Sequence, residues 1–121
     1  MLLSSITMFG VADSESEILN EMHERIVRRF LDMVILMELR KHSMSGYNVI
    51  SFVHNKFNMS VSSGIVYSCL YFLERNGLIN GEGTQGKKVY TLTEQGKERV
   101  KAFLNSKDKI LGLVLNLFIG V

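Results

Sequence analysis

The residues best suited to chemistry in this 121-residue chain are hydroxyl-bearing and basic side chains between positions 60 and 90. Five serines and tyrosines fall between Ser62 and Tyr71, and Lys87 and Lys88 follow. Hydroxyl groups near a helix start bind phosphate oxygens or base edges, and the free amides of that helix start attract phosphate. Lysines neutralise phosphates and release counterions. These residues favour binding of a polyanion.

Residues suited to catalysis are sparse. His23, His42 and His54 are not spaced to put two on one helical face, and no carboxylate pair or nucleophile motif accompanies them. The glycines at 81–86 precede an expected strand, whereas a phosphate-binding loop starts a helix. Cys69 is the single cysteine, which argues against a disulfide and a zinc site. We expect no enzyme activity, no catalytic residue, no metal and no cofactor.

The net charge of +2 hides an uneven distribution. Three basic and seven acidic residues precede Arg40, whereas nine basic and four acidic residues lie between Arg40 and Lys101. A basic middle behind an acidic flank is typical of small nucleic-acid binders. The length allows one domain and hardly a second.

The two ends of the chain, residues 1–12 and 110–121, carry almost no charge. Each is shorter than the roughly 20 residues of a membrane-spanning helix. The first stretch has no preceding Lys or Arg, unlike a signal peptide. We therefore expect a cytoplasmic protein that does not enter the membrane.

Apolar residues at helical spacing predict the elements of the N-terminal part. Ser14 and Glu17 fit a capping box, and the spacing continues to about Lys41, as one long helix or two in line. A turn over 42–46 follows. Ser45 is placed to cap a second helix.

A third helix is expected after its cap, Ser62, and ends at the left-handed glycine of Asn76-Gly77. The apolar period then changes to two, so segments 78–80 and 87–92 predict a β-hairpin around a glycine-rich tip. Two helices joined by a short turn, with a basic hairpin after them, form a winged helix-turn-helix. The hairpin is a second arm beside the helix that enters the major groove.

Thr93 is the expected cap of a last helix of about 26 residues, or roughly 39 Å. An apolar stripe that outruns its own domain is expected to be buried against a second copy of the chain, with the first helix packed on the partner's last helix. Such a dimer presents two recognition helices about one DNA turn apart. A membrane-surface anchor is the alternative, but the tail lacks a basic face. The expected dimer residues are Ile18, Met22, Ile26, Val100, Phe103, Leu104, Ile110, Leu111, Val114, Leu117 and Phe118.

Three stretches of the chain resemble the PadR-like transcriptional regulators. They are Ser45-Gly-Tyr47, the run over 61–79 that closes with Leu-Glu and Gly-Leu-Ile, and Tyr-Thr-Leu-Thr-Glu-Gln-Gly over 90–96. The resemblance covers about residues 34–101. The family's Thr-Leu-Tyr-Pro is Ile-Val-Tyr-Ser at 65–68 here, so one hydroxyl and the proline are missing. The resemblance implies that a small aromatic or drug-like effector is a further partner to consider.

DNA contacts are expected from the third helix, from the wing and from two lysines that flank the second helix. The plain alternative is that these side chains are ordinary solvated positions. The expected residues are Ser62, Ser63, Tyr67, Ser68 and Tyr71, then Thr84, Gln85, Lys87 and Lys88, and finally Lys41 and Lys56.

The expected fold is mostly α with a small β-hairpin. Residues 1–13 form an N-terminal extension, 14–92 the winged helix-turn-helix, and 93–121 a dimerisation helix. The predicted function is a homodimeric, sequence-specific regulator that binds double-stranded DNA and represses from a pseudo-palindromic operator. The alternative is a winged helix used for protein–protein assembly, without a specific operator.

Overall fold

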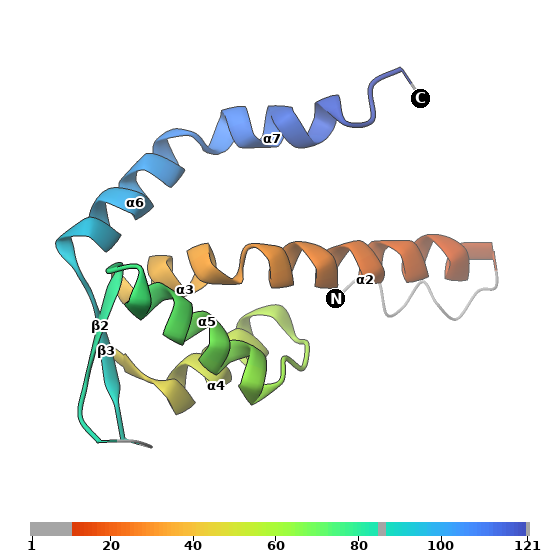
Figure 1. Cartoon of the computed structure of the whole chain (residues 1–121). Helices are drawn as coiled ribbons and strands as arrows, with labels where there is room; N and C mark the ends of the chain where they lie inside the picture. The colour runs from red at the N-terminus through yellow and green to blue at the C-terminus, as the bar shows by residue number, and fades with distance from the viewer. Residues whose placement is uncertain (1–10, 85–86, 121) are drawn as a thin grey trace.

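A computed structural model describes residues 11–84 and 87–120 of the chain. It is mostly helical with a small antiparallel sheet, as the sequence predicts (Figure 1). The elements are α2 (Val11–Arg29), α3 (Leu31–Leu39), β1 (Met44–Ser45), α4 (Gly46–Phe57), α5 (Ser63–Arg75), β2 (Ile79–Glu82), β3 (Val89–Leu92), α6 (Glu94–Asn105) and α7 (Lys107–Asn116).

Helices α2 and α3 run almost in line and meet at Phe30 (Figure 1). Phe30 has φ −102° and ψ 15°, although its N–H still donates to the Ile26 carbonyl at 3.0 Å. Of the two arrangements that the apolar spacing allows, one long helix or two helices in line, the chain adopts the second. The predicted cap at Ser14 is wrong, because α2 already begins at Val11 and no glycine or proline interrupts it before Ser14.

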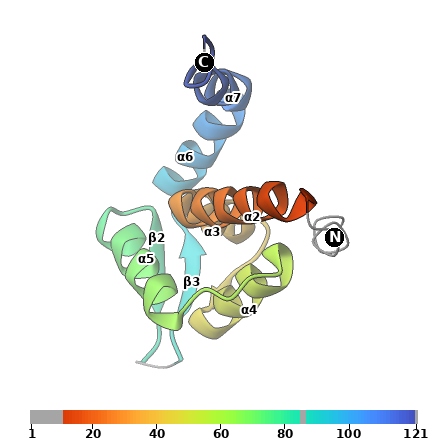
Figure 2. The same ribbon diagram turned by 90° about the vertical axis from the view of Figure 1, so that its right-hand side faces the viewer.

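The hydrophobic core lies between α3, α4, α5, the sheet and α6 (Figure 2). Each fully buried aliphatic side chain contributes about 1.5–3 kcal/mol relative to an exposed one. This packing fixes α4 and α5 against α3 and thereby orients the outer face of α5. The apolar residues at most 1% exposed are Ile35, Leu36, Val49, Val53, Val66, Leu70, Leu73 and Val100.

The predicted caps at Ser45, Ser62 and Thr93 are confirmed. In each case the side-chain oxygen accepts a hydrogen bond from the backbone N–H three residues later, at 3.0 to 3.3 Å. The Asn48 side chain also accepts from the Ser45 N–H, which completes a capping box. Gly77 has φ +75° at the end of α5, again as predicted.

The sheet has the strand order β1-β3-β2 and is antiparallel throughout. The predicted hairpin is confirmed, but the predicted turn over 42–46 is wrong at Met44 and Ser45, which pair with β3. A strand of two residues is too short to show an alternating pattern in the sequence. Tyr90 of β3 lies opposite Met44 on one side and Gly81 on the other.

The predicted single C-terminal helix is broken at Ser106. This residue has φ −107° and ψ 2°, so α6 and α7 meet at an angle (Figure 1). Helix α6 packs on the domain, whereas α7 contains no buried residue and leads away from it. Among the described residues, no helix combines the length and the apolar character needed to cross a membrane.

Candidate nucleic-acid interface

One face of α5 packs on the core, and the opposite face is open. Helical spacing puts Gly64, Ser68, Tyr71 and Arg75 on the open face, and all four are exposed. Tyr71 is 64% exposed, with its phenol available for hydrogen bonding. We call these four residues the α5 stripe. Arg75 was not among the expected DNA contacts, although its position four residues after Tyr71 is a signal in the sequence.

Tyr67 lies beside the α5 stripe and joins α5 to the start of α4. Its ring packs against Gly46, where a Cβ atom would lie 2.5 Å from the ring carbon Cε1. Glycine at 46 therefore makes room for the aromatic ring. The neighbouring Tyr47 is 72% exposed, and it is a second surface residue that sequence reasoning missed.

The start of α5 is also open to solvent. The Ser62 side-chain oxygen caps the helix by accepting a hydrogen bond from the Ile65 N–H, and the next residue, Ser63, is exposed. The first amides of this 13-residue helix point away from its body, which makes the end electropositive. These serines therefore lie where a phosphate would be attracted.

The hairpin of β2 and β3 is the wing, and its two lysines lie in different surroundings. Lys87 is exposed, whereas the Lys88 ammonium lies 2.9 Å from a carboxylate oxygen of Glu74 on α5. The hydrogen bond to Glu74 raises the pKa of Lys88, so its side chain stays charged. Thr84 is exposed, and Gln85 lies outside the described residues.

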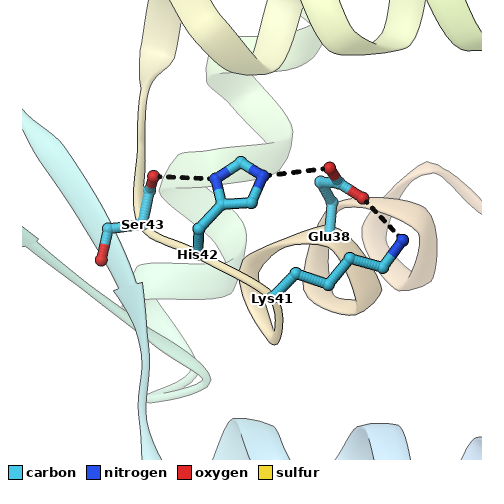
Figure 3. Close-up of polar contacts among 4 residues, drawn as sticks. All are labelled: Glu38, Lys41, His42 and Ser43. Atoms are coloured by element: carbon cyan, nitrogen blue, oxygen red, sulfur yellow. Dashed lines mark hydrogen bonds and ion pairs between the residues drawn. The ribbon is translucent and has the colours of Figure 1, made fainter.

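Lys41 and Lys56 lie together between α3 and α4, around a hollow of about 200 Å³. The Lys41 ammonium forms an ion pair with one Glu38 carboxylate oxygen at 3.4 Å, and the His42 ring nitrogen Nε2 lies 3.2 Å from the other (Figure 3). The Lys56 ammonium lies 5.9 Å and 5.8 Å from the ring centroids of Phe52 and Phe57. Within the described residues, no hydrogen bond or ion pair joins either lysine to α5 or the wing.

The expected dimer residues fall into three groups by burial. Val100 is 0% exposed and lies in the core of its own chain, so its assignment to the dimer interface is wrong, and Phe103 and Leu104 pack against the same core. Met22 and Ile110 are half-buried. The exposed members are Ile18, Ile26, Leu111, Val114, Leu117 and Phe118, and Leu113, Leu115 and Ile119 are further exposed apolar residues of the C-terminal segment.

Two hollows lie between α2–α3 and α6–α7. One, of about 330 Å³, is lined by Ile26, Phe30, Phe103, Lys107, Ile110, Leu111 and Val114. The other, of about 510 Å³, is lined by Arg29, Phe30, Asp32, Met33, Arg99, Ala102, Phe103, Ser106 and Ile110. The second therefore combines two guanidinium groups with aromatic side chains. Among the described residues, no three His, Cys, Asp or Glu side chains are grouped to hold a metal ion.

Comparisons with known proteins agree with this geometry. The model of the family described as "Transcriptional regulator PadR-like family" matches residues 35–102. No curated protein sequence shows a significant match. A PadR family transcriptional regulator from Eggerthella lenta has a similar structure, with 21% identity, coverage of 91% of this chain and 100% of that chain, and a TM-score of 0.70.

Bacillus subtilis PadR is also similar and has been solved in complex with operator DNA. It is 34% identical over 63% of this chain and 47% of its own, with a TM-score of 0.56. Its structure with p-coumaric acid matches at 34% identity over 64% of this chain and 42% of that chain, with a TM-score of 0.54. The matched part is thus about half of Bacillus subtilis PadR.

Proposed function

The chain belongs to the PadR-like family of transcriptional regulators, and from this premise we propose that it is a homodimeric repressor that binds a specific operator. Helix α5 enters the major groove, and the wing follows the backbone or the minor groove. The single observation that carries this proposal is the exposed α5 stripe, and it is accompanied by an exposed wing lysine, Lys87. We also propose the division into an extension (1–13), a DNA-binding domain (14–92) and a dimerisation segment (93–121).

Direct reading of bases is supported by the chemistry of the α5 stripe. Arg75 can donate two hydrogen bonds to guanine, and Ser68 and Tyr71 can bond to base edges or phosphates. The wing lysine supplies positive charge beside this helix. The Bacillus subtilis relative, solved with operator DNA, supports the same use of the domain.

The homodimer is supported by the apolar surface of α7. Leu111, Val114 and Phe118 are exposed on one face, and Leu117 is 72% exposed beside them. A contiguous apolar surface of this kind marks an interaction site on a water-soluble protein. A second copy would cover it and place two α5 helices on one duplex.

Titration of a duplex from upstream of the chain's own gene, with random duplex as competitor, tests this function. Specific retention against the competitor supports an operator-binding regulator. If any competitor abolishes duplex binding equally, the result contradicts an operator-binding regulator. It would favour protein–protein assembly, which the exposed apolar residues of α7 alone would support. The substitution Arg75→Gln is expected to lower specific binding by 5-fold or more, since about 1–3 kcal/mol of discrimination is lost with a bidentate contact.

A small-molecule effector is a further part of the proposed function. The 510 Å³ hollow offers Arg29 and Arg99 to a carboxylate, and Phe30 and Phe103 to an aromatic ring. The structure of the relative with p-coumaric acid supports an aromatic acid as the class of ligand. Calorimetric titration with p-coumarate tests this: Arg29→Gln with Arg99→Gln should abolish binding, and Arg40→Gln should not. Absence of binding to the unaltered chain rejects this ligand class.

A further inference from the structure

Helix α5 is tied to the wing through one side chain, Glu74. One carboxylate oxygen accepts from the Lys88 ammonium at 2.9 Å, and the other accepts from the Gly81 backbone N–H at 3.2 Å. In the described part of the chain, these are the only side-chain hydrogen bonds between α5 and the hairpin. Glu74 therefore contacts β2 and the residue that precedes β3 at once.

The path of the Lys88 side chain depends on glycine at position 81. A Cβ atom there would lie 2.5 Å from Lys88 Cε, 3.0 Å from Tyr90 Cε1 and 3.1 Å from Glu74 Oε2. The φ of Gly81 is not positive, so the backbone alone does not require glycine. The missing side chain instead lets Lys88 cross β2 and reach α5.

Lys88 also lies close to an aromatic ring. Its ammonium lies 5.8 Å from the centroid of the Tyr90 ring, within the range of a cation–π contact. The side chains of Lys88 and Glu74 are 36% and 29% exposed, and each neutralises the other. Lys88 therefore has little free charge to offer a phosphate, whereas the exposed Lys87 has its full charge available.

We propose that Glu74 and Lys88 are positioning residues that set the angle between the wing and α5, and that Lys87 alone of the two lysines neutralises a phosphate. This inference rests on the proposed DNA-binding function, because the angle matters only if α5 and the wing contact one duplex together. It also revises the expectation that both wing lysines contact DNA directly.

Operator affinity measured by fluorescence anisotropy across a salt series separates the two roles. Lys87→Met should reduce the slope of log K against log salt by about 0.9, the value for one phosphate contact. Lys88→Met should weaken binding several-fold at every salt concentration and leave the slope unchanged. Glu74→Gln retains an acceptor for the Gly81 N–H but loses the charge, and it should behave as Lys88→Met does.

The double variant Glu74→Gln/Lys88→Met should bind no more weakly than either single variant, since the two residues act as one unit. Gly81→Ala changes no charge and should have the same effect by obstructing Lys88. The proposal is overturned if Lys88→Met lowers the slope, or if Glu74→Gln tightens binding. Either result would mean that Lys88 is a phosphate contact restrained by Glu74.

A measurement without DNA keeps this inference separate from the proposed function. Hydrogen exchange of the amides of β2 and β3 should be faster in Lys88→Met and Glu74→Gln than in the unaltered chain, and unchanged in Lys87→Met. Equal exchange in all of them would overturn the positioning role even if the operator is bound. Failure of the unaltered chain to bind any operator would instead reject the proposed function alone.

Discussion

Gly64 is the residue of α5 whose identity the chain itself does not explain. No atom lies within 4 Å of the place where its Cβ would be, and its φ is not positive. Glycine in a helix costs about 0.5–1 kcal/mol relative to alanine. Its use at an exposed helix start suits close approach of another molecule's backbone, which is a DNA strand under the proposed function.

Gly64→Ala is therefore expected to raise the free energy of unfolding by about 0.5 kcal/mol and to weaken operator binding. Urea denaturation and anisotropy titration measure the two effects. The matched control is Gly112→Ala in α7, where the Cβ would also meet no atom within 4 Å. This control should stabilise the chain and leave operator affinity unchanged; equal operator affinity in both variants would contradict the close approach.

Cys69 on α5 is a free, half-buried cysteine. Burial, and to a lesser degree the carboxylate of Asp32, raise its pKa from 9.0 to about 11. The folded chain thus holds this proton more tightly than the unfolded chain. The resulting contribution to stability is complete below pH 9.0 and is lost as the pH rises toward 11.

Thermal unfolding of the unaltered chain and of Cys69→Ala between pH 8 and pH 11 tests this. The difference in Tm between the two should shrink or reverse as the pH rises, because only the unaltered chain has this proton to lose. Lysines and tyrosines titrate in both, so they cancel in the difference. A constant difference across the range would show that the thiol is not responsible.

At the scale of the element, Thr93 connects the hairpin to α6. Its oxygen accepts from the Gly96 N–H at 3.0 Å, and its hydroxyl donates to the Gly77 carbonyl at 2.6 Å. The same side chain thus starts α6 and anchors the residue that ends α5. This double contact joins the start of α6 to the end of α5.

Thr93→Ala should lower the free energy of unfolding by about 1–2 kcal/mol, since the loss of an N-cap costs about this much. Thr91→Ala is the control: this residue is exposed on β3, and its hydroxyl makes one longer bond, of 3.4 Å, to the Asn80 carbonyl. Denaturant melts of both variants measure the difference. A smaller loss for Thr93→Ala than for Thr91→Ala would contradict the double contact.

At the scale of the whole molecule, the broken C-terminal helix divides two tasks. Helix α6 buries Val100 in the core, and α7 keeps its apolar residues exposed. The break at Ser106 lets α7 leave the domain without disturbing the packing of α6. The surface of α7 is therefore available to a second copy while the DNA-binding part remains intact.

Leu111→Glu combined with Val114→Glu should convert a dimer into a folded monomer, because neither side chain is buried within its own chain. Sedimentation measures the mass, and circular dichroism should show nearly unchanged helix content. Lys109→Glu with Asn116→Glu adds negative charge to another part of α7 and should leave the dimer intact. A monomeric unaltered chain at micromolar concentration would contradict the proposed assembly.

Features that depend on neighbours three or four residues away could be predicted from the sequence. The caps at Ser45, Ser62 and Thr93 and the end of α5 at Gly77 are of this kind, because their hydrogen bonds close within one turn. Tertiary structure alone decided which distant segments meet. Helix packing buries Val100 in the core. Pairing with β3 makes Met44–Ser45 a strand, and the register of the hairpin places Lys88 next to Glu74. Contacts between residues far apart in the chain depend on the angle and register of whole elements, which no local pattern of residues encodes.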